Sequence, residues 1–346
     1  MAPQESNGAQ VASFAKEITL LPDQLTVTVT YHDVETAAGP LRCWTYVTSG
    51  YWAAGHPELS FTLRVGAAEH PYGLPDAPLQ LFGDFFRRLG HGQRVLPGER
   101  LEMEGDGFLG LGGLALVRPY PLPGVTLSAP TLAAIGLHAT ELEGIHQLGM
   151  TRVLARLGKR YSSYPYPLHT DRGRPALDLA GDLQKSALTY VPTASIPNLF
   201  TSFEDGTIIL RGLLPATRFL RARLHSMPEG ERFALLTEYD LSADSQLVWE
   251  PDDTLTNLSH AQATGKRIGA GFCVFIPGQE WDEGQRVEDG YAMLLTDESW
   301  QTLRQALTGG APLYVPPAGG GYGLRLEWLA RPPYVYPGLP QAGAEA

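Results

Sequence analysis

Nine histidines and two cysteines are the side chains of this 346-residue sequence best suited to bind a metal or to act as nucleophiles. The histidines are scattered, and no two of them have the His-x-His or His-x-x-x-His spacing that brings imidazoles onto one ion. Cys43 and Cys273 lie among bulky apolar residues in strand-like runs, where burial makes a thiol inert. We therefore expect no catalytic residue, no metal site and no cofactor.

Glycine-rich runs at 110–113, 269–271 and 319–323 look like phosphate-binding loops, but none has the GxGxxG or GxxxxGK[ST] spacing. Only four lysines accompany 22 arginines, and 37 acidic residues give a net charge of −11. Because clustered positive charge holds nucleic acid, we expect no nucleic-acid partner. Glu204-Asp205-Gly206 and Glu288-Asp289-Gly290 are interpreted as hairpin turns in preference to a cation site.

Residues 161–174 concentrate tyrosine and arginine, which are enriched at the hot spots of protein interfaces. This segment supplies our candidate partner-binding residues, which are Tyr161, Tyr164, Tyr166, Arg172 and Arg174. Its two prolines also fit a rigid extended connector packed between two lobes, and this interpretation stays open. A second alternative is a small-molecule-binding protein or enzyme with a dispersed site between the lobes, using residues such as His169, Asp171 and Glu288.

Strand and helix patterns alternate along the chain, and frequent glycine and proline favour short strands and turns over a helical bundle. One helix is expected from Pro78 to Gly90, and a second from the cap Thr140 to Gly158. A third helix is expected to follow the cap Thr296. The expected strands are 25–31, 42–48, 58–65, 108–117, 232–241, 246–250, 269–276, 291–296 and 322–329.

These elements predict an α+β fold of two sheet-plus-helix lobes whose strands are mostly antiparallel. The first lobe is expected over residues 20–170 and the second over 180–335, with the boundary between about 165 and 185. Residues 1–19 and 338–346 are expected to be flexible ends. The chain has no signal-peptide pattern, no run of 18 apolar residues and only two cysteines, so we expect a cytoplasmic protein without a membrane span.

Several motifs resemble a known family. They are Arg156-Leu157-Gly158, Tyr164-Pro165, Pro167-Leu168, Gly269-Ala270, Val287-Glu288-Asp289-Gly290 and Leu303-Arg304-Gln305-Ala306-Leu307. In order and approximate spacing they resemble the C-terminal region shared by Smad anchor for receptor activation and endofin, a domain of unknown function. The first lobe is also similar to the suppressor-of-fused-like group, through Tyr46-Val47-Thr48, Gly55–Leu59 and Thr140–Glu143. The resemblance implies a suppressor-of-fused-like fold.

The resemblance also implies a non-catalytic protein-binding protein, of adaptor or immunity type. We expect it to bind a protein or peptide partner in the cleft between the lobes or by addition of a strand to a sheet edge. In the animal proteins the resemblance implies a FYVE zinc finger and a Smad-binding segment upstream. Two cysteines cannot build that finger and no Smad-binding segment is recognisable, so we expect neither endosome targeting nor Smad signalling here.

Bacterial suppressor-of-fused-like proteins are proposed as immunity proteins to secreted toxins. A net charge of −11 suits a basic toxin, because complementary charge steers association. Low lysine with abundant arginine, alanine, glycine and proline indicates a GC-rich bacterial source.

Overall fold

The computed structural model describes two compact units of the chain. Among the described residues, the first contains the chain up to Leu142 together with Leu168–Ala176, and the second contains Glu143–Pro167 and the chain from Leu177 to residue 330. The described residues are 14–36, 39–91, 98–103, 108–117, 127, 129–161, 163, 166–181, 186–225, 230–239, 245–247, 258–259 and 267–330. The chain therefore passes from one unit to the other more than once, and each unit is described by itself.

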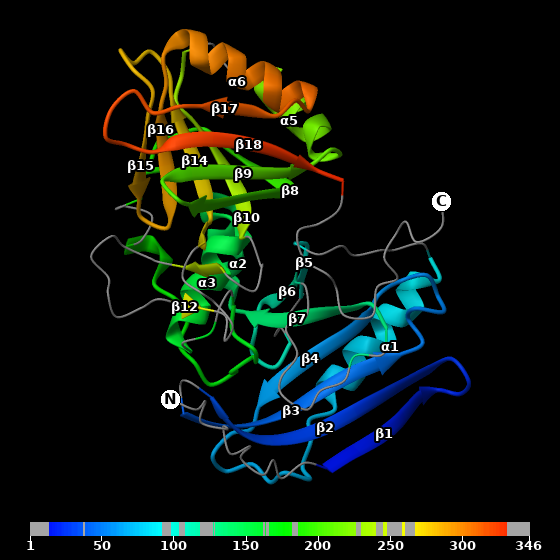
Figure 1. Cartoon of the computed structure of the whole chain (residues 1–346). Coiled ribbons are helices and arrows are strands. Elements are labelled where there is room, and N and C mark those ends of the chain that lie inside the picture. The colour runs from blue at the N-terminus through cyan, green and yellow to red at the C-terminus, as the bar shows by residue number, and fades with distance from the viewer. Residues whose placement is uncertain are drawn as a thin grey trace, which may run out of the picture. The chain divides into compact units, whose positions relative to one another are not determined.

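The first unit is built on a seven-stranded sheet of order β1-β2-β3-β4-β7-β6-β5, in which only the pair β4–β7 is parallel (Figure 1). Its strands are β1 (Phe14–Leu21), β2 (Leu25–Thr36), β3 (Gly39–Ser49), β4 (Glu58–Arg64), β5 (Arg100–Glu102), β6 (Gly113–Val117) and β7 (Thr131–Leu137). Helix α1 (Ala77–Leu89) packs on this sheet, and α2 (Ala139–Leu148) follows β7.

The core of the first unit follows from the alternation of side chains along its strands. Val27 and Val29 of β2 are buried on the same face, whereas Thr28 between them is partly exposed. Phe82 of α1 is buried in this cluster together with Trp44 and Phe61 of the sheet. The expected helix from Pro78 to Gly90 is thus confirmed, because one apolar stripe of it covers the sheet.

The second unit is built on an eleven-stranded sheet, in which β8 pairs with β9, β10 and β13. Its strands are β8 (Thr193–Glu204), β9 (Thr207–Leu213), β10 (Phe233–Tyr239), β11 (Ser245–Leu247), β12 (Leu258–Ser259), β13 (Arg267–Ala270), β14 (Phe272–Ile276), β15 (Glu283–Val287), β16 (Gly290–Leu294), β17 (Leu313–Val315) and β18 (Gly323–Leu329). Its helices include α3 (Met150–Arg160), α5 (Ala216–His225) and α6 (Asp297–Gly309). Antiparallel pairs outnumber parallel ones in both sheets, so the predicted α+β class is confirmed.

The helix expected from Thr140 to Gly158 is in fact two helices, because Gly149 between α2 and α3 has a φ of 83°. That left-handed conformation is open to glycine and ends the ladder of α2, while the Gly149 carbonyl accepts the first bond of α3 from the Val153 amide at 3.3 Å. The start also differs, because Glu141 rather than Thr140 caps α2, accepting the His138 amide at 2.9 Å.

Several expectations about strands also differ from the structure. The strand expected at 269–276 is two strands, β13 and β14, on either side of Gly271. The strand expected at 108–117 begins only at Gly113, because Leu109 and Gly110 take positive φ in a tight turn. The sequence analysis missed β8, whose pattern is interrupted by Asn198 at a φ of 58°. The end expected to be flexible up to residue 19 contains β1 from Phe14 onward, whereas residues 338–346 lie outside the described part of the chain.

Both Glu-Asp-Gly sequences form hairpin turns, as predicted. Asp205 and Gly206 join β8 to β9 with φ values of 48° and 77°. Two consecutive positive φ values are the signature of the turn that matches the twist of the strands. Glu288 and Asp289 join β15 to β16, with Glu288 at a φ of 51°.

Thr296 caps α6 as the sequence predicted, accepting the Ser299 amide on its hydroxyl oxygen at 3.2 Å. We expect Thr296→Ala to lower the free energy of unfolding of the second unit by about 1 kcal/mol, because one helix amide loses its partner. Chemical denaturation measures this change. Thr302→Ala is the control, since the Thr302 hydroxyl bonds only to the Glu298 carbonyl inside the helix; an equal loss in both variants would contradict the cap.

Candidate functional site

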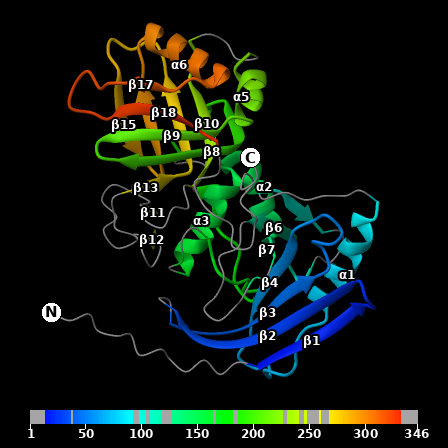
Figure 2. The ribbon, with the colours of Figure 1, turned by 45° about the vertical axis from the view of Figure 1, so that its right-hand side comes forward.

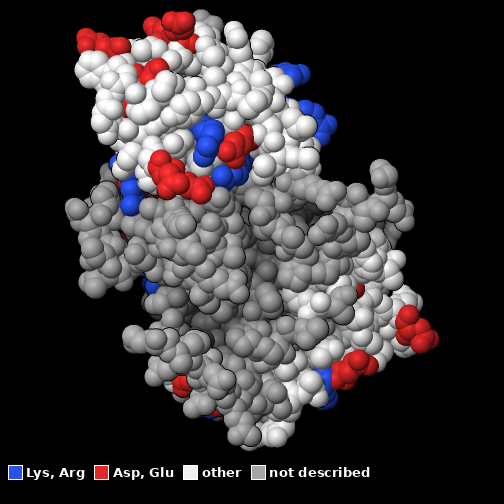
Figure 3. All heavy atoms as spheres, viewed as in Figure 1, with Lys and Arg blue, Asp and Glu red and all other residues white. Residues whose placement is uncertain are grey.

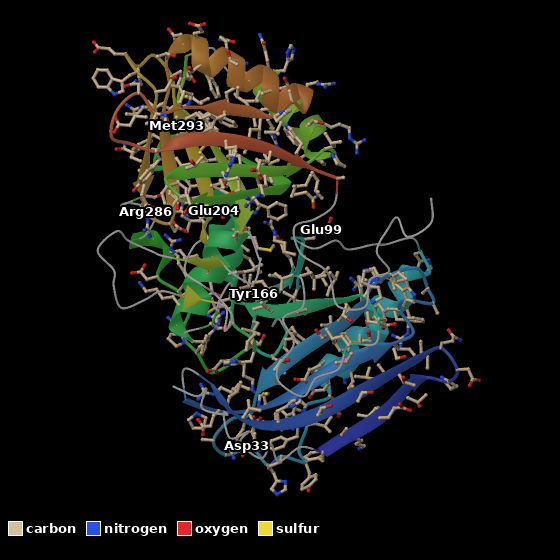
Figure 4. The ribbon with its side chains drawn as sticks, in the orientation of Figure 1. Asp33, Glu99, Tyr166, Glu204, Arg286 and Met293 are labelled. Carbon is tan, nitrogen blue, oxygen red and sulfur yellow. The ribbon has the colours of Figure 1, made fainter. Side chains whose placement is uncertain are left out.

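The five residues expected to bind a partner are divided between the two units. Tyr161 and Tyr166 belong to the second unit, and Arg172 and Arg174 belong to the first. Tyr164 lies outside the described residues. Tyr166, labelled in Figure 4, is only 7% exposed, and Tyr161 is partly buried.

Gly158 explains the sharp end of α3 before these tyrosines. Its carbonyl accepts the amides of Tyr161 at 2.9 Å and Ser163 at 3.0 Å, which turns the chain back over the helix end. A Cβ at Gly158 would lie 2.4 Å from the Ser163 carbonyl oxygen, so only glycine permits this approach. The segment after α3 is therefore packed against the helix at this point.

Arg174 is a buried structural residue. Its guanidinium forms two 2.6 Å bonds with the Glu141 carboxylate, and the two side chains are 3% and 0% exposed. It also donates to the Gly136 carbonyl at 3.2 Å. These contacts hold the 168–176 segment against β7 and the start of α2, so Arg174 offers no surface to a partner in this structure.

Arg172 lines a hollow of about 570 Å³ in the first unit and forms an ion pair with Glu69. The other charged residues of this hollow are Asp33 (labelled in Figure 4), Arg42, Arg64 and Asp171. Burial raises the pKa of Asp171, but the Arg64 guanidinium at 2.8 Å and the Gly173 amide outweigh it and leave that pKa below its ordinary value. Asp171 is thus an ionised partner of arginine and holds no proton to donate at neutral pH.

His169 is buried beside this hollow. Burial, followed by the nearby Arg64 guanidinium, lowers the pKa of His169 to about 4, against a smaller opposing effect of Asp171. The imidazole is therefore neutral at physiological pH. A general base works best with a pKa near the operating pH, so this arrangement does not favour catalysis by His169.

A buried arginine organises the second unit. The Arg152 guanidinium donates to the Asp289 carboxylate at 2.7–3.1 Å and to Glu288 at 2.6 Å, and it stacks over the Phe272 ring at 4.7 Å. Arg156 reaches Asp289 from the next turn of α3 at 3.4 Å. This cluster ties α3 to the turn between β15 and β16.

The chemistry of the Arg152 cluster is structural. Burial alone raises the pKa of Asp289, but the charges of Arg152 and then Arg156 pull it below its ordinary value. Glu288 also accepts the Ala187 amide, and it belongs to the second unit, whereas His169 and Asp171 belong to the first. The sequence analysis missed Arg152. The available signal was a charged residue at apolar spacing from Ile145 and Leu148 in the expected single helix from Thr140 to Gly158.

The strand β1 is an exposed edge of the first unit's sheet. Within the described residues it pairs with β2 alone, and Ala15, Lys16, Glu17 and Thr19 are exposed. Phe14 anchors its start by stacking on Tyr31, with ring centroids 5.5 Å apart. The edge is therefore both accessible and held in place.

Charge is unevenly distributed over the second unit. In Figure 3 acidic side chains gather where α6 begins and basic ones lie near α5. Asp297 and Glu298 are exposed in the first turn of α6, whereas Arg218, Arg221 and Arg223 are exposed on α5. A partner of one sign would therefore be steered to one end of this unit.

Two kinds of feature are absent from the described residues. These residues contain no group of three or more histidine, cysteine, aspartate or glutamate side chains placed to hold a metal ion. None of their helices is long and apolar enough to cross a membrane.

Comparison with known proteins places most of this architecture in a family. The family model described as Smad anchor for receptor activation-like, C-terminal, matches residues 126–315. Zinc finger FYVE domain-containing protein 16 of Mus musculus is 26% identical over 291 residues, which is 77% of this chain and 18% of the mouse protein. This chain thus spans about a fifth of the length of that relative.

Solved structures of suppressor of fused also match. The Sufu-Fu complex crystal structure covers 48% of this chain and 86% of its own, with 16% identity and a TM-score of 0.38. The Drosophila Suppressor of Fused structure covers 87% of this chain and 88% of its own, with 11% identity and a TM-score of 0.35.

Arg152→Ala should lower the free energy of unfolding of the second unit by about 3–5 kcal/mol, because Asp289 would stay buried without its counter-charge. Urea denaturation measures the loss. Arg156→Ala is the matched control, since its contact is longer and its side chain is 14% exposed, and it should cost far less. Similar losses in the two variants would show that Arg152 is not the organising residue.

His169 should make the first unit sensitive to mild acid. Its folded pKa of about 4 lies below the ordinary 6.5, so its contribution to stability is complete above pH 6.5 and is lost as the pH falls from 6.5 to 4. The free energy of unfolding, measured across that range, should fall more steeply for the native chain than for His169→Gln. Parallel curves would contradict a buried neutral imidazole.

Proposed function

This chain belongs to the Smad anchor for receptor activation-like, C-terminal family, and we propose that it is a protein-binding module that takes an extended segment of its partner as a further strand beside β1. The observation that carries this proposal is the eight-residue exposed edge of the first unit's sheet. Of the two binding modes expected from the sequence, strand addition is the one that the described residues support.

The other sheet edges in the described parts of the chain offer fewer backbone groups to an added strand. β5, β12 and β17 have three, two and three residues. β15 is covered, since Gly284 exchanges two backbone hydrogen bonds of 2.8 Å with Tyr322. A segment needs several consecutive backbone partners to bind as a strand, and β1 alone among these edges is long and uncovered.

The charges of β1 fit a specific binding edge. Lys16 and Glu17 are exposed in its middle. Charged residues on an edge strand discourage indiscriminate pairing with other edges, while the backbone remains available to a segment with complementary charges. The edge can therefore select a partner without promoting aggregation.

Of the five candidate residues from the segment 161–174, the proposal keeps Arg172. Arg172 keeps an exposed side chain fraction of 27% at the hollow, so it is the described connector residue best placed to contact a partner of the first unit. The net charge of −11 favours a basic partner. The comparisons name no toxin, so a toxin stays a hypothesis derived from the sequence.

Proline substitutions at Lys16 and Glu17 test strand addition. Neighbouring residues of an antiparallel strand direct their amides alternately to β2 and to the open edge, so one of the two prolines removes an outward amide. That variant should bind the partner at least about fivefold more weakly, the equivalent of about 1 kcal/mol for one hydrogen bond, with little loss of stability.

The partner is first recovered by affinity capture on the native chain from its host lysate, and its affinity is then measured by calorimetry. Lys16→Ala and Glu17→Ala are the controls, because they remove the charges and keep the amides. If both proline variants keep native affinity while folded, the partner does not bind at β1.

A further inference from the structure

A hollow of about 430 Å³ lies between the end of β1 and helix α1, and we call it the β1–α1 hollow. Leu20 and Leu21 line it from the strand. From the helix it is lined by Asp76, Leu79, Gln80, Gly83, Asp84 and Arg87. Figures 1 and 2 show α1 near the end of the sheet at which the turn between β1 and β2 lies.

The helix residues of the hollow recur every three or four positions, so they form one stripe along α1. A different stripe, with Phe82 and Phe85, is buried in the core of the unit. The helix therefore covers the sheet with one face and turns a second face toward the space beside the edge strand. A strand added to β1 would run about 4.8 Å away, next to that second face.

The floor of the β1–α1 hollow is apolar and has unfilled space. Leu79 is buried, and Leu20 and Leu21 are partly buried. Gly83 supplies no side chain, and apart from its two chain neighbours and the backbone of its own helix, no described atom lies within 4 Å of the position that its Cβ would take. An aliphatic side chain from outside would find apolar contacts and a free volume there.

One carboxylate at the rim of the hollow has no ion-pair partner among the described residues. Arg87 already pairs with Asp84. Asp76 precedes α1, makes no side-chain capping bond, and forms no ion pair with any described residue. About 10 Å of helix separates Asp76 from Gly83. In a strand added beside β1, two alternate residues lie ~7 Å apart. If one of them fills the space at Gly83, a long basic side chain on the other can reach Asp76.

We propose that the β1–α1 hollow receives an aliphatic side chain of the partner segment that pairs with β1, and that Asp76 binds a lysine or arginine two residues away in the same segment. Alternate residues of a strand face the same side, which places both side chains toward α1. The inference rests on the proposed strand addition and specifies the chemistry of the segment: extended, with an aliphatic-x-basic pattern.

The probe is a displayed library of random twelve-residue peptides, selected on the full chain, and the affinities of the selected peptides are measured by fluorescence polarisation. The expected result is enrichment of the aliphatic-x-basic pattern. Gly83→Leu fills the hollow and should weaken binding about tenfold, while Arg88→Leu adds the same side chain at an exposed position of α1 outside the hollow and should have no effect.

Asp76→Asn should remove the preference for a basic residue and weaken basic peptides about threefold or more. Glu35→Gln is its control, because it removes an exposed carboxylate of the first unit that does not line the hollow. Circular dichroism and thermal unfolding establish that each variant is folded. If Gly83→Leu does not fold, Gly83→Ala, a smaller addition in the same space, replaces it.

The outcomes separate the hollow from the strand edge. One outcome is that the selected peptides bind the β1 proline variants more weakly, lack the aliphatic-x-basic pattern and bind Gly83→Leu as tightly as the native chain. This outcome would contradict the proposal for the hollow and would still support strand addition at β1. Peptides that bind the β1 proline variants with native affinity would contradict strand addition at β1. A library that yields no binder would contradict both proposals.

Discussion

The bidentate pair between Glu141 and Arg174 is the contact on which the course of the chain depends. Glu141 caps α2 and binds Arg174 at the same time, so the helix start and the 168–176 segment are fixed by one carboxylate. Two buried charges are tolerable only when each satisfies the other, because the cost of removing either from water is several kcal/mol. The first unit therefore includes a segment that follows α3, the helix of the other unit.

The Arg152 cluster is a second buried pair of opposite charges, and it lies in the second unit. Arg152 and Asp289 are 137 residues apart in sequence, yet they meet without solvent and fix α3 to the turn between β15 and β16. The turn thus has two functions: its Glu-Asp-Gly sequence supplies the backbone conformation of a hairpin, and its carboxylates accept the arginine. Both charged pairs lie within the region matched by the family model.

The buried ion pairs are not accessible to a partner. A partner can bind only where backbone groups or apolar side chains at the surface have no contacts within the chain. In the first unit the edge strand β1 is one such place, because Phe14 holds it against Tyr31 while its outer side stays uncovered within the described residues. The flank of α1 adds a wall beside the same edge. A strand edge with a helix wall offers main-chain bonds for affinity and one pocket for selectivity, which suits an extended partner segment.

The sequence by itself determined the local elements: the apolar alternation of β2, the proline start of α1, the threonine cap of α6 and the two hairpin turns, since each depends on residues within a few positions of one another. It also determined the family, through short motifs kept in order. Only the tertiary structure decided that Arg174 and Tyr166 are interior residues, that Gly149 divides the helix, and that β1 pairs on one side only within the described part of the chain. Burial, ion pairing and strand neighbours are relations between residues distant in sequence, and local pattern carries no information about which of them meet.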